Sequence, residues 1–236
     1  MKTLGIDGCR AGWIAISLDE EHAGYWLLES DRELGEYFEE YDRIFIDIPI
    51  GLEEESYVRQ CDRELRAVLG ADYSASIVNP PIRGALHAPT YAEASMTSYE
   101  ITGKKVSIQS WNITSDIKAV DQYLQRNKVL REKIFESHPE LLFQKLNGGN
   151  PILQKKATKK GLRHRLDLLK KESEFADDFF RDIKEKFRRN QVDEDDIVDA
   201  MALALFARYS TTREIKTLPE VPPTDATGLE MAIHYV

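Results

Sequence analysis

An apolar run of strand length, Arg-Ile-Phe-Ile-Asp-Ile-Pro at residues 43–49, constrains the fold more than any other segment. The segment before it begins with Asp31, a helix N-cap residue, and continues with apolar residues at helical spacing. A strand that is reached through a helix is best placed parallel to its neighbour in the interior of a sheet. Because helices cover both faces of such sheets, the sequence predicts an α/β fold.

Three further strands are predicted ahead of that helix, at Lys2–Asp7, Gly12–Leu18 and Tyr25–Glu29. Short polar or glycine-containing turns separate them, which is typical of an antiparallel meander. A fifth buried strand is predicted at Lys133–Glu136, where it ends before His-Pro. The central sheet is therefore expected to be mixed, with a three-strand antiparallel meander plus parallel strands, and to be flanked by helices.

The rest of the chain predicts helices and one irregular segment. Helices are expected at residues 57–69, 139–146, 155–171, 174–189 and 195–209. Residues 70–118 have a poor pattern broken by proline and glycine, so we expect an irregular insertion there, with a function of its own. Residues 91–99 and 117–124 are candidate helices in and beside it. The proline-rich segment from Thr217 is expected to lie over the surface. Without an internal repeat or a clear boundary, residues 1–236 are expected to form a single domain.

The composition excludes several classes of protein. It is 42% apolar and 31% charged, as in ordinary soluble proteins, and no apolar run approaches the ~20 residues that span a bilayer. The two cysteines, Cys9 and Cys61, are far apart in the chain. They are too few for a disulfide framework, and a structural zinc site is not expected. With no signal-like N-terminal segment, a cytoplasmic location is the expectation.

Three aspartates occupy positions that a globular core normally gives to apolar residues. Asp7 ends the first predicted strand, Asp47 lies within the apolar run at 43–49, and Asp199 lies within the apolar helix at 195–209. A buried carboxylate needs an ion-pair partner, a hydrogen-bond shell or a metal ion. One shared cation would satisfy all three side chains more simply than three separate salt bridges.

A fourth acid, Asp196, lies three residues before Asp199, so that both project from one face of the helix. Carboxylates are oxygen ligands that suit Mg²⁺ or Mn²⁺. We therefore expect Asp7, Asp47, Asp196 and Asp199 to hold metal. Each has an alternative role, since Asp7 could bind turn amides, Asp47 could cap a loop, and Asp196 could satisfy the helix N-terminus.

Two more residues are candidates for the catalytic set. Glu136 and His138 alternate along one face of the fifth predicted strand, just before Pro139. If that strand is next to the sheet centre, Glu136 ends near the aspartates and His138 could transfer protons, because its ordinary pKa lies near neutrality. A histidine next to proline also fits a purely structural role.

The charge of the chain is −9 overall but unevenly distributed. Residues 155–171 hold eight lysines and arginines against one aspartate, whereas residues 193–199 hold five acids. A basic segment with an acidic cluster fits a metal-dependent enzyme that acts on a phosphate polymer, and a solvated basic helix is the alternative. The expected nucleic-acid-binding residues are Lys155, Lys156, Lys159, Lys160, Arg163 and Arg165.

Other arginines are spread along the chain. Arg10, Arg59, Arg66 and Arg83 could also bind phosphate. An ordinary surface or ion-pair role is the expectation for each of them.

Five sequence blocks, in order, resemble a known family. They are GIDGCRAGW, IDIPIGL, CDRELRAVLG, ESHPELLF followed by NGGNP, and DIVDAMALA, and they span residues 5–204. The family is domain of unknown function 429, regarded as predicted nucleases of the RNase H-like kind. The resemblance implies an RNase H-like fold and nuclease activity.

The last block also resembles the terminal helix of RuvC-type resolvases, in which a D-x-x-D-A pattern supplies two metal-binding acids. Asp196, Asp199 and Ala200 match that pattern. By the same analogy Asp7 matches the aspartate of the first strand, and Asp47 the acid of the fourth. RuvC-type enzymes typically have glutamate at this last position, so a shorter side chain stands here.

Together these features predict a metal-dependent nuclease with Mg²⁺ or Mn²⁺ as its cofactor and nucleic acid as its partner. One alternative is a nucleotide-binding ATPase related to actin and the sugar kinases, whose halves share this core. Another is a non-enzymatic module on the same scaffold that binds nucleic acid or protein.

Overall fold

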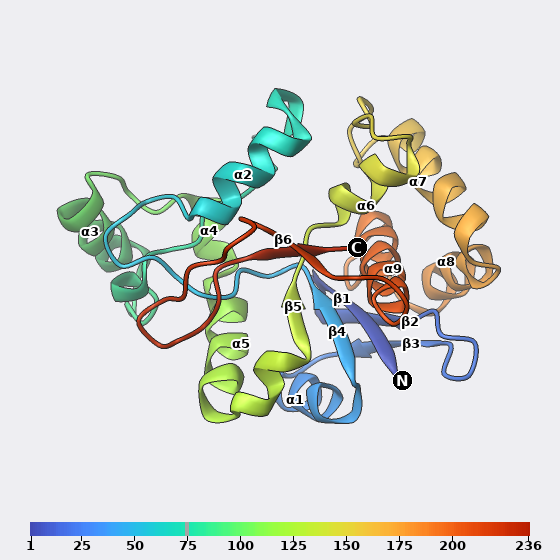
Figure 1. Ribbon diagram of the computed structural model, residues 1–236, viewed down its shortest axis with the longest axis horizontal. Coiled ribbons are helices and arrows are strands. Elements are labelled where there is room, and N and C mark those ends of the chain that lie inside the picture. The colour runs from blue at the N-terminus through green and yellow to red at the C-terminus, as the bar shows by residue number, and fades with distance from the viewer. Residues whose placement is uncertain (74–75) are drawn as a thin grey trace. The chain divides into compact units, whose positions relative to one another are not determined.

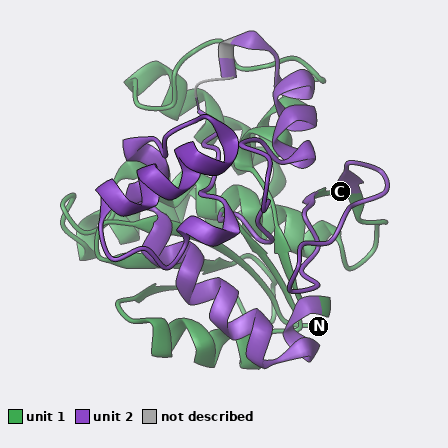
Figure 2. Ribbon diagram, turned by 90° about the vertical axis from the view of Figure 1, so that its left-hand side faces the viewer, with its two compact units in different colours: residues 1–47, 132–216, 234–236 green, residues 48–131, 217–233 purple. Residues whose placement is uncertain are grey.

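The computed structural model describes residues 1–73 and 76–236, and the chain forms two compact units within them (Figure 2). Unit 1 consists of residues 1–47, 132–216 and 234–236. Unit 2 consists of residues 48–131 and 217–233. The sequence predicted one domain with an insertion at 70–118. The second unit is longer than that insertion and includes a segment from near the C-terminus.

In the described part of unit 1, five strands form one sheet in the order β3-β2-β1-β4-β5 (Figure 1). The strands are β1 (Thr3–Cys9), β2 (Gly12–Ser17), β3 (Gly24–Leu28), β4 (Arg43–Ile46) and β5 (Ile134–Glu136). The first three form an antiparallel meander, whereas β4 pairs in parallel with both β1 and β5. This confirms the predicted α/β fold with a mixed sheet, and the arrangement is consistent with the RNase H-like kind.

Helices of unit 1 flank this sheet (Figure 1). They are α1 (Asp31–Glu40), α6 (Pro139–Leu146), α7 (Lys159–Glu172), α8 (Phe175–Lys186) and α9 (Glu194–Tyr209). Each was predicted from its apolar spacing, with bounds that differ by a few residues. The N-cap of α1 is Ser30, one residue before the expected Asp31, and its side chain accepts a hydrogen bond from the Glu33 N–H.

Helix α9 packs directly on the central strand β1. A Cβ atom at Gly5 would collide with the α9 backbone at Ala200 and Ala204, so glycine permits this close approach. The ring of Phe45 in β4 lies 6.0 Å from that of Phe206 in α9, measured between centroids. Because side chains alternate along a strand, Asp7 shares the α9-covered face of β1 with Gly5.

Unit 2 is mostly helical. It contains α2 (Gln60–Leu69), α3 (Tyr91–Thr102), α4 (Ile108–Asn112) and α5 (Thr114–Arg126). Short 3₁₀ segments occur at Ala71–Tyr73, Arg83–Ala85 and, at the edge of the unit, Lys128–Glu132. Helices α3, α4 and α5 occupy much of the region predicted to be irregular. Helices α3 and α5 correspond to the candidate helices at 91–99 and 117–124, whereas the five-residue α4 was not predicted.

The segment from Thr217 differs in part from its prediction. It includes the strand β6 (Lys216–Leu218) and leads to β7 (Ile233–Tyr235). Its proline-rich part lies at the surface as expected, since Val221 is 83% exposed, whereas Leu229 and Met231 near its end are buried in unit 2. Among the residues that the structure describes, no helix combines the length and apolar character that crossing a bilayer requires.

Candidate functional site

Two aspartates meet where the parallel strands of unit 1 end. Ile6 of β1 is paired with Ile46 of β4, and the Asp47 N–H donates to the Ile6 carbonyl at 3.1 Å. Asp7 lies in β1 and Asp47 directly follows β4, so the two residues are neighbours and their side chains lie on the same face of the sheet. This is the face that α9 covers.

Helix α9 brings a third carboxylate to this point. Asp199 is 2% exposed. The pKa of Asp7 is well above its ordinary value. Burial of Asp7 is the main cause, and repulsion by the carboxylates of Asp199 and Asp47 adds to it. We call Asp7, Asp47 and Asp199 the acid cluster.

The other carboxyl groups here are also hard to ionise. Burial raises the pKa of Asp47 to about 7, and the charge of Asp199 contributes to the increase. Burial likewise raises the pKa of Asp196 to about 6. Burial and the nearby acids Asp196 and Asp7 also raise the pKa of the Cys9 thiol to about 12, which disfavours its thiolate form at neutral pH. The cluster thus combines low solvation with excess negative charge.

Lys156 supplies positive charge to the cluster. Its Nζ lies 2.6 Å from Asp199 Oδ2 and 4.0 Å from Asp195 Oδ2. Its pKa is raised by the charge of Asp199 and, to a smaller extent, by Asp7 and Asp47. Lys156 was predicted to bind nucleic acid with the basic segment, whereas the structure turns its ammonium group to the aspartates.

Asp196 has a double role. Its Oδ2 accepts a hydrogen bond of 2.8 Å from the Asp193 N–H, which forms one half of a capping box at the start of α9. The alternative role considered from the sequence, satisfaction of the helix N-terminus, is therefore present in the structure. The same carboxylate remains close enough to Asp199 for the charge of Asp199 to raise its pKa.

The structure does not bring Glu136 to the acid cluster. Glu136 is paired with Ile46, so its side chain shares the face of Ile46 and points away from the face of Asp47. His138 is the N-cap of α6, and its Nδ1 accepts from the Glu140 N–H at 3.3 Å.

A buried ion pair lies beside the cluster and was not predicted. Arg165 of α7 donates from Nε and Nη2 to the two carboxylate oxygens of Glu140 in α6, each at 2.9 Å. Arg165 is 1% exposed, which corrects the prediction that it binds nucleic acid. Burial raises the pKa of Glu140 to about 7, with a contribution from Asp199, although Arg165 opposes the increase. In the sequence, the apolar residues Leu166 and Leu169 near Arg165 indicate that this face of α7 is buried.

The other members of the predicted basic group remain at the surface. They are Lys155, Lys159, Lys160 and Arg163. Arg163 lies 3.8 Å from Asp167 in a solvent-exposed ion pair.

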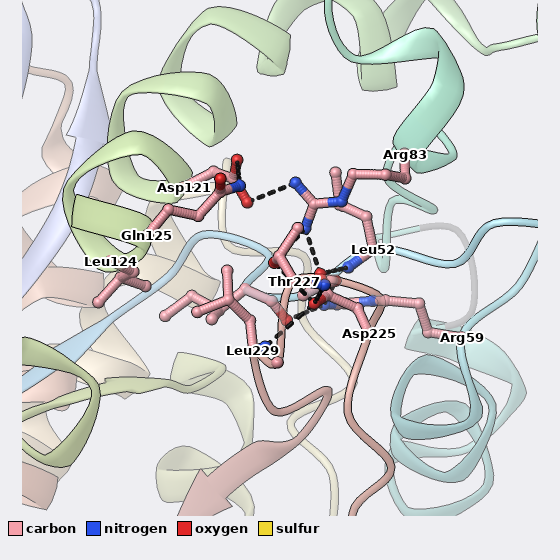
Figure 3. Close-up of polar contacts among 12 residues, drawn as sticks. Leu52, Arg59, Arg83, Asp121, Leu124, Gln125, Asp225, Thr227 and Leu229 are labelled. Carbon is pink, nitrogen blue, oxygen red and sulfur yellow. Dashed lines mark hydrogen bonds and ion pairs between the residues drawn. The ribbon is translucent and has the colours of Figure 1, made fainter. Parts of the chain in front are cut away.

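Two arginines of unit 2 have the ion-pair role that was expected of them. Arg59 donates to both oxygens of the buried Asp62. Arg83 joins Asp121 and Asp225, as Figure 3 shows. Neither guanidinium is available for phosphate in this arrangement.

The acid cluster fits a divalent cation by its chemistry. It offers carboxylate oxygens, and Asp199 Oδ1 is buried without a hydrogen-bond partner among the described residues. The ammonium of Lys156 already lies where positive charge is needed. As the side chains stand, no three His, Cys, Asp or Glu residues of the described chain are grouped as metal ligands. A metal ion therefore requires Lys156 and the carboxylates to rearrange.

Comparison with known proteins identifies a family but no function. A family model described as "Protein of unknown function (DUF429)" matches residues 5–224. No curated protein and no solved structure matches the chain.

Proposed function

The chain belongs to the DUF429 family of proteins of unknown function, so its activity must be inferred from its site, and we propose that it is a divalent-metal-dependent phosphodiester hydrolase that acts on nucleic acid. The observation that carries the proposal is that Asp47 and Asp199 lie close enough to the buried Asp7 for their charges to raise its pKa. Burial and mutual repulsion oppose the ionisation of Asp7, whereas a cation would favour it. A folded protein keeps such an arrangement at a stability cost, which is common at functional sites.

The charge of the cluster argues for a further cation. The Lys156 ammonium is a single positive charge beside three carboxyl groups, and the pKa values of Asp7 and Asp47 stay raised in its presence. A divalent cation would favour the ionised form of these groups. The unpartnered Asp199 Oδ1 is an available oxygen at the same place. Mg²⁺ and Mn²⁺ take such oxygen ligands, and a bound ion would supply Lewis acidity and an activated water at neutral pH.

The chain's own residues have distinct parts in this proposal. Asp7, Asp47 and Asp199 hold the cation, and Asp196 contributes from the first turn of α9 while it caps the helix. Lys156 has a half-exposed side chain, so it can turn from Asp199 to a substrate phosphate when a metal ion replaces its charge. The exposed lysines of the basic segment attract the polyanion, and this attraction weakens as salt is added.

The test is hydrolysis of labelled DNA, RNA, branched junctions and nucleotides with Mg²⁺, Mn²⁺ or EDTA. We expect metal-dependent cleavage that Asp7→Asn and Asp199→Asn each abolish. Asp178→Asn, on the exposed surface of α8, is the matched control and should leave cleavage unchanged. Binding of Mn²⁺ measured by calorimetry should fall in the same two variants. Cleavage at the wild-type rate in the Asp7→Asn, Asp199→Asn double variant would overturn the proposal.

The position of Lys156 also favours a second candidate, a non-enzymatic nucleic-acid-binding module. In that case the ammonium is a permanent partner of Asp199, and the exposed basic residues alone bind the polyanion. The same experiments separate the two functions. Binding of nucleic acid that EDTA does not affect, without Mn²⁺ binding or cleavage of any substrate, would favour the module.

A further inference from the structure

A groove in unit 2 has a charge unlike that of the chain as a whole. It encloses about 610 Å³, within the range of ~300–1,000 Å³ that is usual for small-molecule sites. The chain has 41 acidic and 32 basic residues. The groove, however, is lined by Arg63 and Arg66 and by no described carboxylate. Its charge therefore favours an anionic ligand.

Arg66 is held in place by neutral groups. Its Nη2 donates to the Ile77 carbonyl at 2.7 Å and to Asn79 Oδ1 at 2.6 Å. These two acceptors fix the guanidinium plane without cancelling its charge. Nε and Nη1 take no part in these two bonds, and a guanidinium fixed in this way loses little conformational freedom when it binds a phosphate.

Arg63 adds a second positive charge to the same wall. It lies three residues before Arg66 in α2, so the two side chains are neighbours on the helix surface. Arg63 is exposed, and the carboxyl group of Glu53 is near enough for the charge of Arg63 to act on its pKa, although Glu53 does not line the groove. Two adjacent guanidiniums suit the several oxygen atoms of one phosphate group.

The other walls of the groove suit a planar ring. Tyr57, Val58 and Ile77 supply aromatic and aliphatic surface. Asn79 and Gln109 line the same groove and carry amides that can donate and accept hydrogen bonds. Aromatic surface with a positively charged wall is the combination that binds nucleotide units through stacking and phosphate contacts.

We propose that this groove binds a nucleotide, with Arg63 and Arg66 holding its phosphate and the Tyr57, Val58 and Ile77 surface holding its base. The ligand is either a free nucleotide or one unit of a nucleic-acid strand, since both present the same chemistry. The groove belongs wholly to unit 2, so its ligand binding does not depend on the acid cluster of unit 1.

The test is calorimetry on the full chain, in EDTA so that metal binding does not contribute. The probes are nucleoside monophosphates, the corresponding nucleosides, inorganic phosphate and a short single-stranded DNA. We expect a monophosphate or the DNA to bind, and to bind more tightly than either the nucleoside or phosphate alone. Arg63→Ala should weaken this binding by about tenfold or more, because a charge-assisted contact to phosphate is lost.

Arg63 is the residue to substitute because no hydrogen bond of its guanidinium to the described fold would be lost. Arg66→Ala would also remove the hydrogen bonds to the Ile77 carbonyl and to Asn79 Oδ1. The matched control is Arg126→Ala, which removes an exposed arginine of unit 2 that does not line the groove. Binding of a free monophosphate identifies a nucleotide site, and binding of the DNA alone identifies a strand site. Equal affinity in Arg63→Ala, phosphate binding as tight as that of the nucleotides, or no binding of any probe would overturn the proposal.

Discussion

Among single residues, Lys156 has the largest effect that we expect on the charge of the acid cluster. Its ammonium group pairs with Asp199, a buried carboxylate that otherwise has an unpartnered oxygen. A buried charge that loses its partner destabilises the folded state by far more than an exposed one. The stability of the protein without metal should therefore depend on Lys156, and metal should substitute for it.

Lys156→Met is expected to lower the midpoint of thermal unfolding in EDTA, and Mn²⁺ should restore more of it than it adds to the wild type. The reason is that Mn²⁺ no longer competes with an ammonium group for the carboxylates. Thermal unfolding with and without Mn²⁺ measures both effects. Lys155→Met, at the exposed neighbouring position, should change neither value. A Lys156→Met protein that Mn²⁺ stabilises no more than the wild type would contradict a metal site.

The acid cluster should also make stability depend on pH. The pKa of Asp47 is raised from 3.8 to about 7 by burial and by Asp199. The folded state then binds a proton more tightly than the unfolded state does. The free energy of unfolding should consequently rise as pH falls from about 8 to about 5, because protonation removes the charge that burial disfavours.

Asp47→Asn should flatten this part of the pH profile, since the amide takes up no proton. Denaturant unfolding in EDTA at a series of pH values measures the slope. Asp178→Asn, exposed on α8, should keep the slope of the wild type. An unchanged slope in Asp47→Asn would show that Asp47 is not the group that takes up the proton.

At the scale of elements, the Glu140–Arg165 pair joins α6 to α7. Both helices contact α9, which carries Asp199, and the pair itself is almost fully buried. It therefore fixes two helices that surround the acid cluster. A bidentate contact between a guanidinium and a carboxylate sets an orientation that a lysine would not reproduce.

Arg165→Met should reduce the free energy of unfolding by about 3 kcal/mol or more at neutral pH, because it leaves Glu140 buried without its partner. The loss should be smaller near pH 5, since Glu140 then accepts a proton in the folded state. Denaturant unfolding at the two pH values measures this difference. Arg163→Met, two residues earlier on the exposed side of α7, should cost little. An equal loss of unfolding free energy in Arg165→Met and Arg163→Met would show that the buried ion pair stabilises the fold no more than the exposed one.

At the scale of the whole molecule, unit 2 depends on contacts between residues far apart in the chain. Asp225 accepts hydrogen bonds from Thr227, from the Leu229 N–H at 3.0 Å and from the Leu52 N–H at 3.1 Å. These bonds and Arg83 lower its pKa although burial alone would raise it. The network in Figure 3 thus attaches the segment 217–233 to the rest of unit 2.

Arg83→Met should loosen this segment, because Asp225 and Asp121 both lose a cationic partner. Hydrogen exchange followed by mass spectrometry should show faster exchange in residues 217–233 than in the wild type. Arg126→Met, an exposed change in the same unit, is the control and should leave the exchange unchanged. Wild-type protection of residues 217–233 in Arg83→Met would mean that apolar burial alone holds the segment.

Much of the fold was predictable because its signals are local. Strands and helices have different periods of apolar residues, and the order strand, strand, strand, helix, strand restricts the sheet to few arrangements. Asp7, Asp47 and Asp199 were also identifiable, since a charged residue within an apolar segment is visible in the sequence alone. In unit 2, α4 was not predictable because its five residues are too few to show a helical period.

What the sequence left undecided depends on register and on contacts across long stretches of chain. A shift of one position places Glu136 on the opposite face from Asp47, and no local pattern specifies that register. Lys156 and Arg165 belong to one basic segment and look equally solvated, yet one meets Asp199 and the other Glu140. Amino-acid order therefore determined the elements and their acidic residues, whereas tertiary packing decided which charges pair, because electrostatic partners are set by distance in space and by burial.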